Sequence, residues 1–421
     1  NLGRNEMMEM KRYKLSEIGE VRMCKRILKE ETNSVGGVPF FKIGTFGGQA
    51  DVFITKEKFK EYKNAYSYPK KGDILISAAG TIGRTVVFDG KDAYFQDSNI
   101  VWIENDESKV LNEYLFYCYK NIRWTTSVGS TILRLYNDDI RNTDIIVPHL
   151  SEQKKISSVL SSLDDKIALN KKINAKLEAM AKRLYDYWFV QFDFPNEEGK
   201  PYKSSGGKMV WNEVLKREIP EGWEVVEMSS VIKQINTGLN PRDNFILGNG
   251  KIKYITVKNL TEEGHIDFSN CELVNSEAQK IIHERSQIQK GDILFASICP
   301  LGRCYLIQDS PEDWDINESV FSIRPNIDRI TSEFLYTLLR EAYYVKKMTQ
   351  KATGSIFKGI RINDIEKIEI VLPPKEVINA FSEKTLPIFN YQLTIQKEIQ
   401  KLTALRDRLL PLLMNGQVEL E

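Results

Sequence analysis

The chain has 421 residues, and its 59 basic and 58 acidic side chains give a net charge of +1. This length suggests two or three domains, and a composition of 42% hydrophobic and 28% charged residues excludes a disordered chain. No apolar run approaches the roughly 20 residues that cross a bilayer, and the polar stretch 1–10 lacks the apolar core of a signal peptide. We therefore expect a cytoplasmic protein without membrane contact.

Cysteine and histidine give no pattern of a disulfide framework or a metal site. The cysteines are odd in number and scattered, and only Cys299 and Cys304 lie close together, without the second pair that a zinc site needs. The histidines, His149, His265 and His283, are isolated from one another, so each is expected to be structural or on the surface. No metal ligand is predicted.

The chain repeats one plan. Lys71-Gly72-Asp73-Ile74-Leu75 recurs 219 positions later as Lys290-Gly291-Asp292-Ile293-Leu294. Further matches keep the same order at offsets that grow from 210 to 225: Tyr13/Trp223, Gly83-Arg84/Gly302-Arg303, Gly129-Ser130/Gly354-Ser355, Ile140/Ile365 and Pro148/Pro373. A slowly growing offset is what insertions in surface loops produce. We therefore predict an internal duplication.

In chain order, each copy begins with a globular part and ends with a long helix. Short β-like runs broken by Gly, Pro, Asn and Asp predict a mixed α/β globular domain in residues 11–147 and again in 223–372. Residues 148–190 and 373–416 are predicted as long helices. Within 373–416, Pro387 is expected to mark either a break or a first-turn position at which the second long helix would begin. Between the copies, the Gly-, Ser- and Pro-rich stretch 191–222 is predicted to be a surface linker.

The two helices carry apolar residues at alternating steps of four and three, the seam of a coiled coil. The apolar seam or packing residues are Leu163, Ile167, Leu177, Leu184, Trp188, Ile399, Leu402, Leu409 and Leu413. An amphipathic helix on a globular core is the simpler alternative. If each domain keeps the same relation to its own helix, the helices run antiparallel about a pseudo-two-fold axis. Such a chain would present two different binding domains, to two DNA half-sites or to two protein partners.

Several motifs resemble type I restriction–modification specificity (S) subunits, the HsdS family. Val147-Pro148-His149-Leu150-Ser151-Glu152-Gln153-Lys154-Lys155-Ile156 resembles the start of that family's central conserved region, and Leu184-Tyr185-Asp186-Tyr187-Trp188-Phe189 resembles its far end. The stretches Phe192-Asp193-Phe194-Pro195, Ile219-Pro220-Glu221-Gly222-Trp223 and 405–418 are similar to its later segments. His149 departs slightly, because the family more often has Pro or Leu there.

The resemblance implies two target recognition domains, each reading one half of a bipartite, asymmetric site in double-stranded DNA. It also implies two long antiparallel helices that separate the domains and dock two modification (methyltransferase) subunits and restriction (translocase/nuclease) subunits. No cofactor is expected in this chain; S-adenosylmethionine, ATP and magnesium are expected on those partners. The helix-end residues Tyr185, Trp188 and Phe189 are then candidates for docking as well as for packing.

Candidate DNA-binding residues lie in polar loops and basic stretches, and are Lys42, Arg84, Arg134, Lys258, Asn259, Arg303, Lys358 and Arg361. Arg84 and Arg303 each follow a Gly-rich turn. That turn indicates either a loop approaching DNA or only a tight bend that needs glycine. Repetition favours the bend slightly, because framework recurs between copies whereas base-reading residues should differ.

Catalytic motifs are missing from the sequence. Leu372-Pro373-Pro374-Lys375 has the prolines of an adenine methyltransferase loop without its Asn/Asp or aromatic partners, and there is no Walker A loop. Asp51, Glu61 and Lys63 imitate a nuclease pattern but are expected to be a solvated face. We therefore predict a non-catalytic subunit. A self-contained restriction or modification enzyme and a bivalent protein-interaction scaffold are the alternatives.

Overall fold

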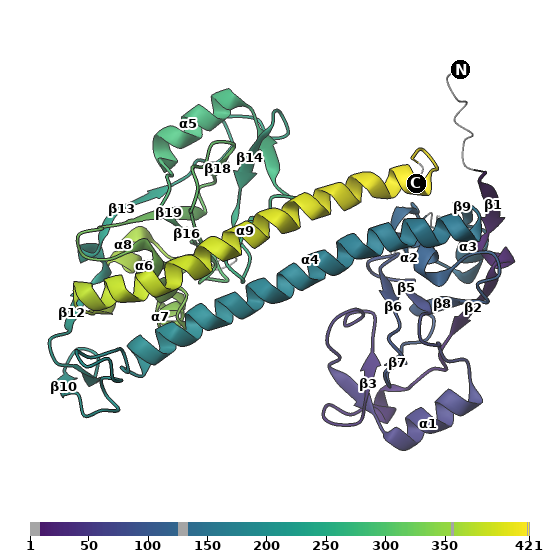
Figure 1. Ribbon diagram of the computed structural model, residues 1–421, viewed down its shortest axis with the longest axis horizontal. Coiled ribbons are helices and arrows are strands. Elements are labelled where there is room, and N and C mark those ends of the chain that lie inside the picture. The colour runs from purple at the N-terminus through teal and green to yellow at the C-terminus, as the bar shows by residue number, and fades with distance from the viewer. Residues whose placement is uncertain (1–8, 125–133, 355–357, 419, 421) are drawn as a thin grey trace. The chain divides into compact units, whose positions relative to one another are not determined.

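The computed structural model describes residues 9–124, 134–354, 358–418 and 420 (Figure 1). They form two compact units, residues 1–168 with 400–421, and residues 169–399. Each unit contains one α/β repeat together with parts of both long helices, α4 (Leu150–Tyr185) and α9 (Lys375–Met414). No helix in these described ranges is long and apolar enough to span a membrane.

The first unit has a four-stranded antiparallel sheet in the order β2-β8-β5-β6, a three-stranded sheet β4-β3-β7 and the antiparallel pair β1-β9. Its elements are β1 Lys11–Lys14, β2 Gly19–Met23, β3 Val38–Phe41, β4 Val52–Ile54, α1 Lys56–Ala65, β5 Ile74–Ser77, β6 Thr85–Val87, β7 Tyr94–Phe95, β8 Ile100–Asn105, α2 Asn112–Asn121, α3 Asn137–Arg141 and β9 Asp144–Val147. Strand β3 pairs antiparallel with β4 and parallel with β7. The domain is therefore mixed α/β.

The second unit repeats this topology strand for strand. The order β13-β19-β16-β17 corresponds to β2-β8-β5-β6, β15-β14-β18 to β4-β3-β7, and β12-β20 to β1-β9. Its elements are β12 Glu224–Glu227, β13 Ile232–Thr237, β14 Ile252–Ile255, β15 Glu272–Val274, α5 Ser276–Ser286, β16 Ile293–Ala296, β17 Cys304–Leu306, β18 Trp314–Ile316, β19 Val320–Pro325, α6 Ser332–Leu339, α7 Ala342–Lys351, α8 Ile362–Glu366 and β20 Glu369–Leu372. The predicted duplication is thus present in the fold.

The repeated Lys-Gly-Asp motif builds the same turn before the central strand in both units. Asp73 accepts a hydrogen bond from the Lys70 backbone N–H at 2.7 Å, and Asp292 accepts one from the Gln289 backbone N–H at 3.1 Å. The glycine before each aspartate, Gly72 and Gly291, has a φ angle of +96° and +92°, respectively. This left-handed conformation is unfavourable for residues that carry a side chain. The motif therefore recurs because the turn needs it.

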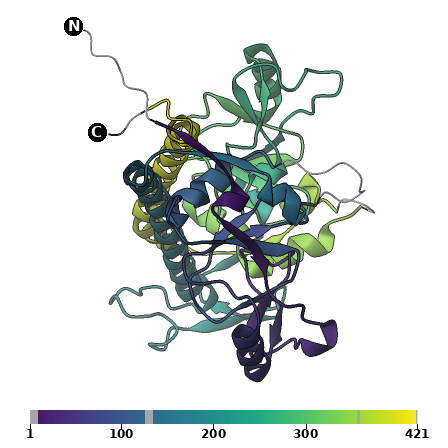
Figure 2. The same ribbon diagram turned by 90° about the vertical axis from the view of Figure 1, so that its right-hand side faces the viewer.

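Within each unit, the parts of α4 and α9 that belong to it lie side by side (Figures 1 and 2). In the first unit, Ile156 and Leu160 of α4 share a core with Leu413 and Met414 of α9. In the second unit, the later part of α4 meets the earlier part of α9, where Asn170 donates to Glu398 at 2.9 Å. This order of contacts requires opposite helix directions. The seam residues are buried or half-buried, as the 3.5-residue period predicts.

Helix α9 begins at Lys375 and passes through Pro387, so the prediction that it begins at Pro387 was wrong. A proline inside a helix removes one backbone hydrogen bond and costs about 3 kcal/mol. Here Phe381 and Phe389, on either side of Pro387, are both buried in one core, and their burial offsets that cost. Pro148 and Pro373, which precede the two helices at equivalent positions, mark the starts more accurately.

The segment 191–222 is more ordered than a surface linker. It contains an antiparallel hairpin of β10 (Met209–Asn212) and β11 (Arg217–Pro220). Phe192 and Phe194 are buried in the core of the second unit, where both contact Trp223. The Gly and Ser residues that suggested a linker form turns between these packed side chains.

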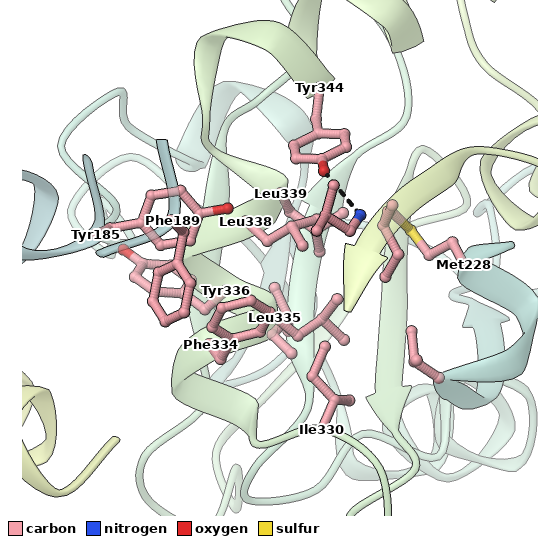
Figure 3. Close-up of a cluster of buried hydrophobic side chains, with 14 of the residues drawn as sticks. Tyr185, Phe189, Met228, Ile330, Phe334, Leu335, Tyr336, Leu338, Leu339 and Tyr344 are labelled. Carbon is pink, nitrogen blue, oxygen red and sulfur yellow. Dashed lines mark hydrogen bonds between the residues drawn. The ribbon is translucent and has the colours of Figure 1, made fainter. Parts of the chain in front are cut away.

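Aromatic side chains join α4 to the second repeat. Tyr185, at the end of α4, and Phe189, in the π-helical segment Asp186–Val190 that comes next, point toward Phe334 of α6 (Figure 3). The ring centroids of Phe189 and Phe334 are 4.7 Å apart in an edge-to-face arrangement. In the same core, the Tyr344 hydroxyl accepts from the Val371 backbone N–H at 3.3 Å. The helix end is therefore part of the domain core.

We expect Arg324→Met to be strongly destabilising. Arg324 binds the carboxylate of Asp292 through two hydrogen bonds of 2.8 Å, and the Asp292 side chain is only 1% exposed. Removing the cation leaves a buried carboxylate unpaired, which costs about 3–5 kcal/mol. Chemical denaturation should show this loss in unfolding free energy. Arg329→Met is the control, because its partner Glu224 is mostly exposed. Equal stability of the two variants would contradict the prediction.

A second prediction concerns Asp164, which accepts hydrogen bonds from Arg406 at 2.7 Å and Tyr117 at 3.1 Å. Burial alone would raise the pKa of Asp164, but the Arg406 hydrogen bond and the charges of Lys120 and Arg406 outweigh it and lower that pKa. A depressed folded-state pKa stabilises the fold above the unfolded value near 4, and this stability is lost as the pH falls below it.

Asp164→Asn should therefore cost about 1–2 kcal/mol of unfolding free energy at pH 7. The difference from the unsubstituted protein should shrink as the pH is lowered from about 4 toward the depressed folded-state pKa of Asp164. Denaturation midpoints measured across pH 3–7 test this, with Asp407→Asn, whose side chain is 59% exposed, as the control. A deficit that stays constant with pH would rule out the carboxylate charge as its cause.

Candidate nucleic-acid interface

In the first unit, four loops meet where β3, β5 and β7 end. The Arg84 guanidinium donates to the Phe46 carbonyl at 2.8 Å, which ties the turn after β5 to the loop after β3. Gln96, after β7, accepts from the Ile43 backbone N–H at 3.0 Å. Arg134 donates to the Ser98 carbonyl at 3.0 Å. Three of the predicted sites, Lys42, Arg84 and Arg134, therefore belong to one cluster of loops.

The turn after β5 depends on its glycines. Gly80 has φ +66° and Gly83 has φ +77°. A Cβ atom on Gly83 would lie 2.3 Å from Cδ1 of Trp124, so no side chain fits there. The Arg84 carbonyl accepts from the Ser77 backbone N–H at 2.9 Å and continues the strand pairing. The glycines are thus explained by the bend alone, while the Arg84 residue remains exposed.

The second unit places Arg303 at the equivalent position. The Arg303 carbonyl accepts from the Ala296 backbone N–H at 2.9 Å, and Gly302 has φ +90°. A guanidinium nitrogen of Arg303 lies 3.3 Å from a carboxylate oxygen of Glu262 in the loop after β14. The Nε atom of Arg303 is buried, with no hydrogen-bond partner among the described residues. Arg303 is therefore more enclosed than Arg84.

The predicted basic stretches lie beside these turns. Arg134 bridges Ala79 in the first unit, and Gly359 bridges Ile298 in the second. The carbonyl of Lys358 accepts from the Cys299 backbone N–H at 2.8 Å, and the Lys358 and Arg361 residues are exposed. The predicted basic stretches that contain Arg134, Lys358 and Arg361 are residues 125–134 and 351–361, and of these, residues 125–133 and 355–357 lie outside the described parts of the chain.

The loops after β3 and β14 carry the remaining predicted residues. Lys42 forms an ion pair of 2.9 Å with Asp51, and its side chain is 39% exposed. Lys258 is exposed in a short 3-10 turn, Val257–Asn259. Both residues can present their ammonium groups to a ligand.

Asn259 does not fit a DNA-contacting role. It is 3% exposed, and its amide oxygen accepts from the backbone N–H and hydroxyl of Thr256, both at 2.9 Å. Its amide nitrogen donates to the carbonyls of Asp267 and Asn270 at 3.2 and 3.3 Å. Every polar atom of the side chain is used to hold the loop. The prediction failed because a polar residue type does not reveal whether its partners are internal.

The half-buried imidazole of His265 belongs to the loop after β14. Burial, and then the positive charge of Arg340, lower the pKa of His265. The lowered pKa disfavours a positive charge on His265 in this loop.

Sequence reasoning missed the loop after β7 and its counterpart after β18. Gln96 donates its backbone N–H to the Phe41 carbonyl, and Asn317 does the same to Ile255, both at 2.9 Å. This polar loop joins the other loops in each unit. The sequence did contain a sign of this loop, because residues 96–99 and 317–319 are short polar runs between two buried strands in both copies.

The residues that resemble a nuclease pattern in the sequence, Asp51, Glu61 and Lys63, do not form a common site in the structure. Asp51 pairs with Lys42, whereas Lys63 pairs with Asp92 at 3.5 Å. Glu61 lies 3.9 Å from Lys58 on the surface of α1. Among the described residues, no group of three or more His, Cys, Asp and Glu side chains is placed to hold a metal ion.

The predicted packing or docking residues lie along α4 and α9 and in the π-helical segment after α4. Ile167, Trp188, Ile399 and Leu413 are buried, and Leu163, Leu177, Leu184, Leu402 and Leu409 are half-buried. Trp188 contacts Phe381 of α9 with ring centroids 6.0 Å apart. These side chains face the protein interior, so docking of another protein would use the more exposed residues around them.

Similarity to known proteins extends over both repeats. Residues 7–179 and 220–405 match the family described as the type I restriction modification DNA specificity domain. The MjaIX specificity subunit of Methanocaldococcus jannaschii is 28% identical over 97% of this chain and 93% of that protein. The HindI specificity subunit of Haemophilus influenzae is 26% identical over 98% and 100% of the two chains.

A more similar but shorter match is a putative type I restriction enzyme specificity subunit of Haemophilus influenzae. It is 54% identical over 175 residues, which make up 41% of this chain and 45% of that relative. The crystal structure of a type I restriction–modification S subunit from M. genitalium has the same fold, with a TM-score of 0.58 and 16% identity over 98% of this chain and 97% of that one. Since the matched family ranges cover more than half of the chain, this protein belongs to the type I restriction–modification DNA specificity family.

Proposed function

We propose that this chain reads a bipartite, asymmetric site in double-stranded DNA, with one half-site for each recognition domain. The observation that carries the proposal is a shared framework with different side chains at matching loop positions. Lys42 and Thr256 correspond because each follows the last paired residue of the equivalent strand, β3 or β14. Arg134 and Gly359 correspond because each forms a bridge with the equivalent residue after the central strand. Two domains with one scaffold and different loop chemistry suit two different half-sites.

The chain itself is proposed to be non-catalytic. The modification subunits would dock along the helices and bring S-adenosylmethionine for adenine methylation, and restriction subunits would bring ATP and magnesium for translocation and cleavage. Exposed apolar residues suited to such docking lie outside the seam, for example Leu169 and Met180 of α4, which are 52% and 51% exposed.

Exchanging residues 11–146 for the equivalent domain of another family member should change one half-site and leave the other unchanged. The reason is that each recognition domain has its own sheets and its own loop cluster. Methylome sequencing of a host that carries the complete system measures both half-sites. Simultaneous change in the two would refute modular reading, and a host without any site-specific methylation would favour the protein-scaffold alternative.

Arg84→Ala and Arg303→Ala should each weaken DNA binding by about 1–3 kcal/mol. A phosphate contact predicts a uniform loss over all sequences and a salt dependence reduced by about one ion, whereas a guanine contact predicts relaxed specificity at one position. Titration of cognate and altered duplexes at several salt concentrations separates the two. Arg141→Ala, an exposed arginine of α3 that pairs with Asp138, is the control. If both variants bind like the control, the turns serve the fold alone.

A further inference from the structure

One buried cation joins three parts of the second unit. Arg340 comes directly after α6, and its side chain is 17% exposed. Its guanidinium donates to the carboxylate of Glu178 on α4 and, at 2.7 Å, to the hydroxyl of Tyr336. It also donates to the carbonyl of Glu262 in the loop after β14 at 2.7 Å. Arg340 therefore connects the long helix, the recognition domain and one of its candidate DNA-facing loops.

The first unit has a corresponding cation, Lys120. Helices α2 and α6 align at an offset of 220, with Tyr114-Leu115 matching Phe334-Leu335, so Lys120 takes the place of Arg340. Lys120 lies 4.1 Å from the ring centre of Phe116, and Arg340 lies 5.1 Å from that of Tyr336. Lys120 also contacts an acid of α4, Asp164, at 3.3 Å. A cation above an aromatic ring, paired with α4, recurs in both copies.

The loop after β14 is held tightly against this anchor. Gly264 has φ +79°, and a Cβ atom there would lie 2.2 Å from the Tyr336 hydroxyl and 3.0 Å from a guanidinium nitrogen of Arg340. The loop can approach so closely only with glycine. Burial raises the pKa of Glu178 despite the opposing effect of Arg340. The Arg340 guanidinium therefore offsets part of the cost of burying this carboxylate.

The anchor leads directly to the candidate interface. Glu262 accepts from Arg340 through its carbonyl and lies 3.3 Å from Arg303 through its carboxylate. A continuous series of polar contacts thus runs from Glu178 on α4 through Arg340 and the 261–265 loop to the turn that bears Arg303. Contacts made by planar guanidinium groups restrict both distance and direction.

We propose that Arg340 and Glu178 are positioning residues that hold the DNA-facing loops of the second recognition domain in one place on helix α4, so that the spacing at which the second half-site is read depends on this ion pair. The inference rests on the proposed DNA-reading function. It assigns the pair a role in spacer selectivity beyond its contribution to stability.

The test uses the full chain with its modification subunits and compares Arg340→Met, Glu178→Gln and Lys397→Met. Glu178→Gln is nearly isosteric, so it keeps the test available if Arg340→Met does not fold. Lys397 of α9 forms an ion pair with Asp309, and these side chains are 55% and 52% exposed. The control thus also breaks an ion pair between a long helix and the recognition domain, but an exposed one that should contribute little.

Duplexes with the methylome-defined half-sites and spacers one base pair longer or shorter are then titrated. Arg340→Met and Glu178→Gln should each reduce the preference for the original spacer about tenfold, a loss comparable to one mismatched base pair, and leave base discrimination in the first half-site unchanged. Lys397→Met should keep the original preference. An equal loss of affinity at every spacer would overturn the proposal, because that is the result of a stabilising role alone.

Hydrogen exchange without DNA separates this inference from the proposed function. Backbone amides of 261–266 should exchange about tenfold faster in Arg340→Met than in Lys397→Met, because local opening becomes easier when the anchor is lost. Equal exchange in the two variants would overturn the anchor even if the chain reads DNA. Failure of the unsubstituted complex to select any sequence, together with faster exchange in Arg340→Met, would overturn the DNA-reading function and spare the anchor.

Discussion

Each recognition domain depends on side chains from both long helices to complete its core. In the first unit, Ile156 and Leu160 of α4 and Leu413 of α9 pack with the four-stranded sheet and α2. In the second, Tyr185 of α4 and Phe381 of α9 are buried in the same cluster as α6. At about 25 cal/mol per Å² of buried apolar surface, such contacts dominate the favourable free energy of folding. The helices are therefore parts of both domains rather than spacers attached to them.

This dependence explains why the repeats keep their framework while their loops differ. Asp73 and Asp292 must form the same turn, and Gly83 and Gly302 must have a positive φ angle, because these turns set the course of strands that pack in the core. The loops that begin at Lys42 and Thr256 extend from the ends of the matching strands β3 and β14, and they include side chains outside the core, such as those of Lys42 and Lys258. A duplicated scaffold can thus diverge in what it binds without losing its core.

The sequence predicted features that depend on periodicity and on repetition. The offsets of 219 and 225 located the matching turns and the prolines that precede the two helices, and the 3.5-residue period located the helix seam. Features that depend on tertiary partners could not be predicted. Pro387 looked like a helix start because local propensity opposes an interior proline, and the burial of Phe381 and Phe389 was not visible. Asn259 looked like a DNA contact because it is polar and lies in a loop. Its four internal hydrogen bonds, with partners up to 11 positions away, could not be foreseen from the sequence.

The near-neutral charge of the chain has a structural counterpart in the candidate interface. Lys42 pairs with Asp51, and Arg303 with Glu262, so the acids offset cations in the very loops that would meet DNA. Solvent-exposed ion pairs are worth about 0–1 kcal/mol, so at the more exposed Lys42–Asp51 pair a correctly placed phosphate or base can replace the acid at little cost. A misplaced ligand meets the acid as well as the cation and gains little. Paired cations therefore favour fit over general attraction to polyanions.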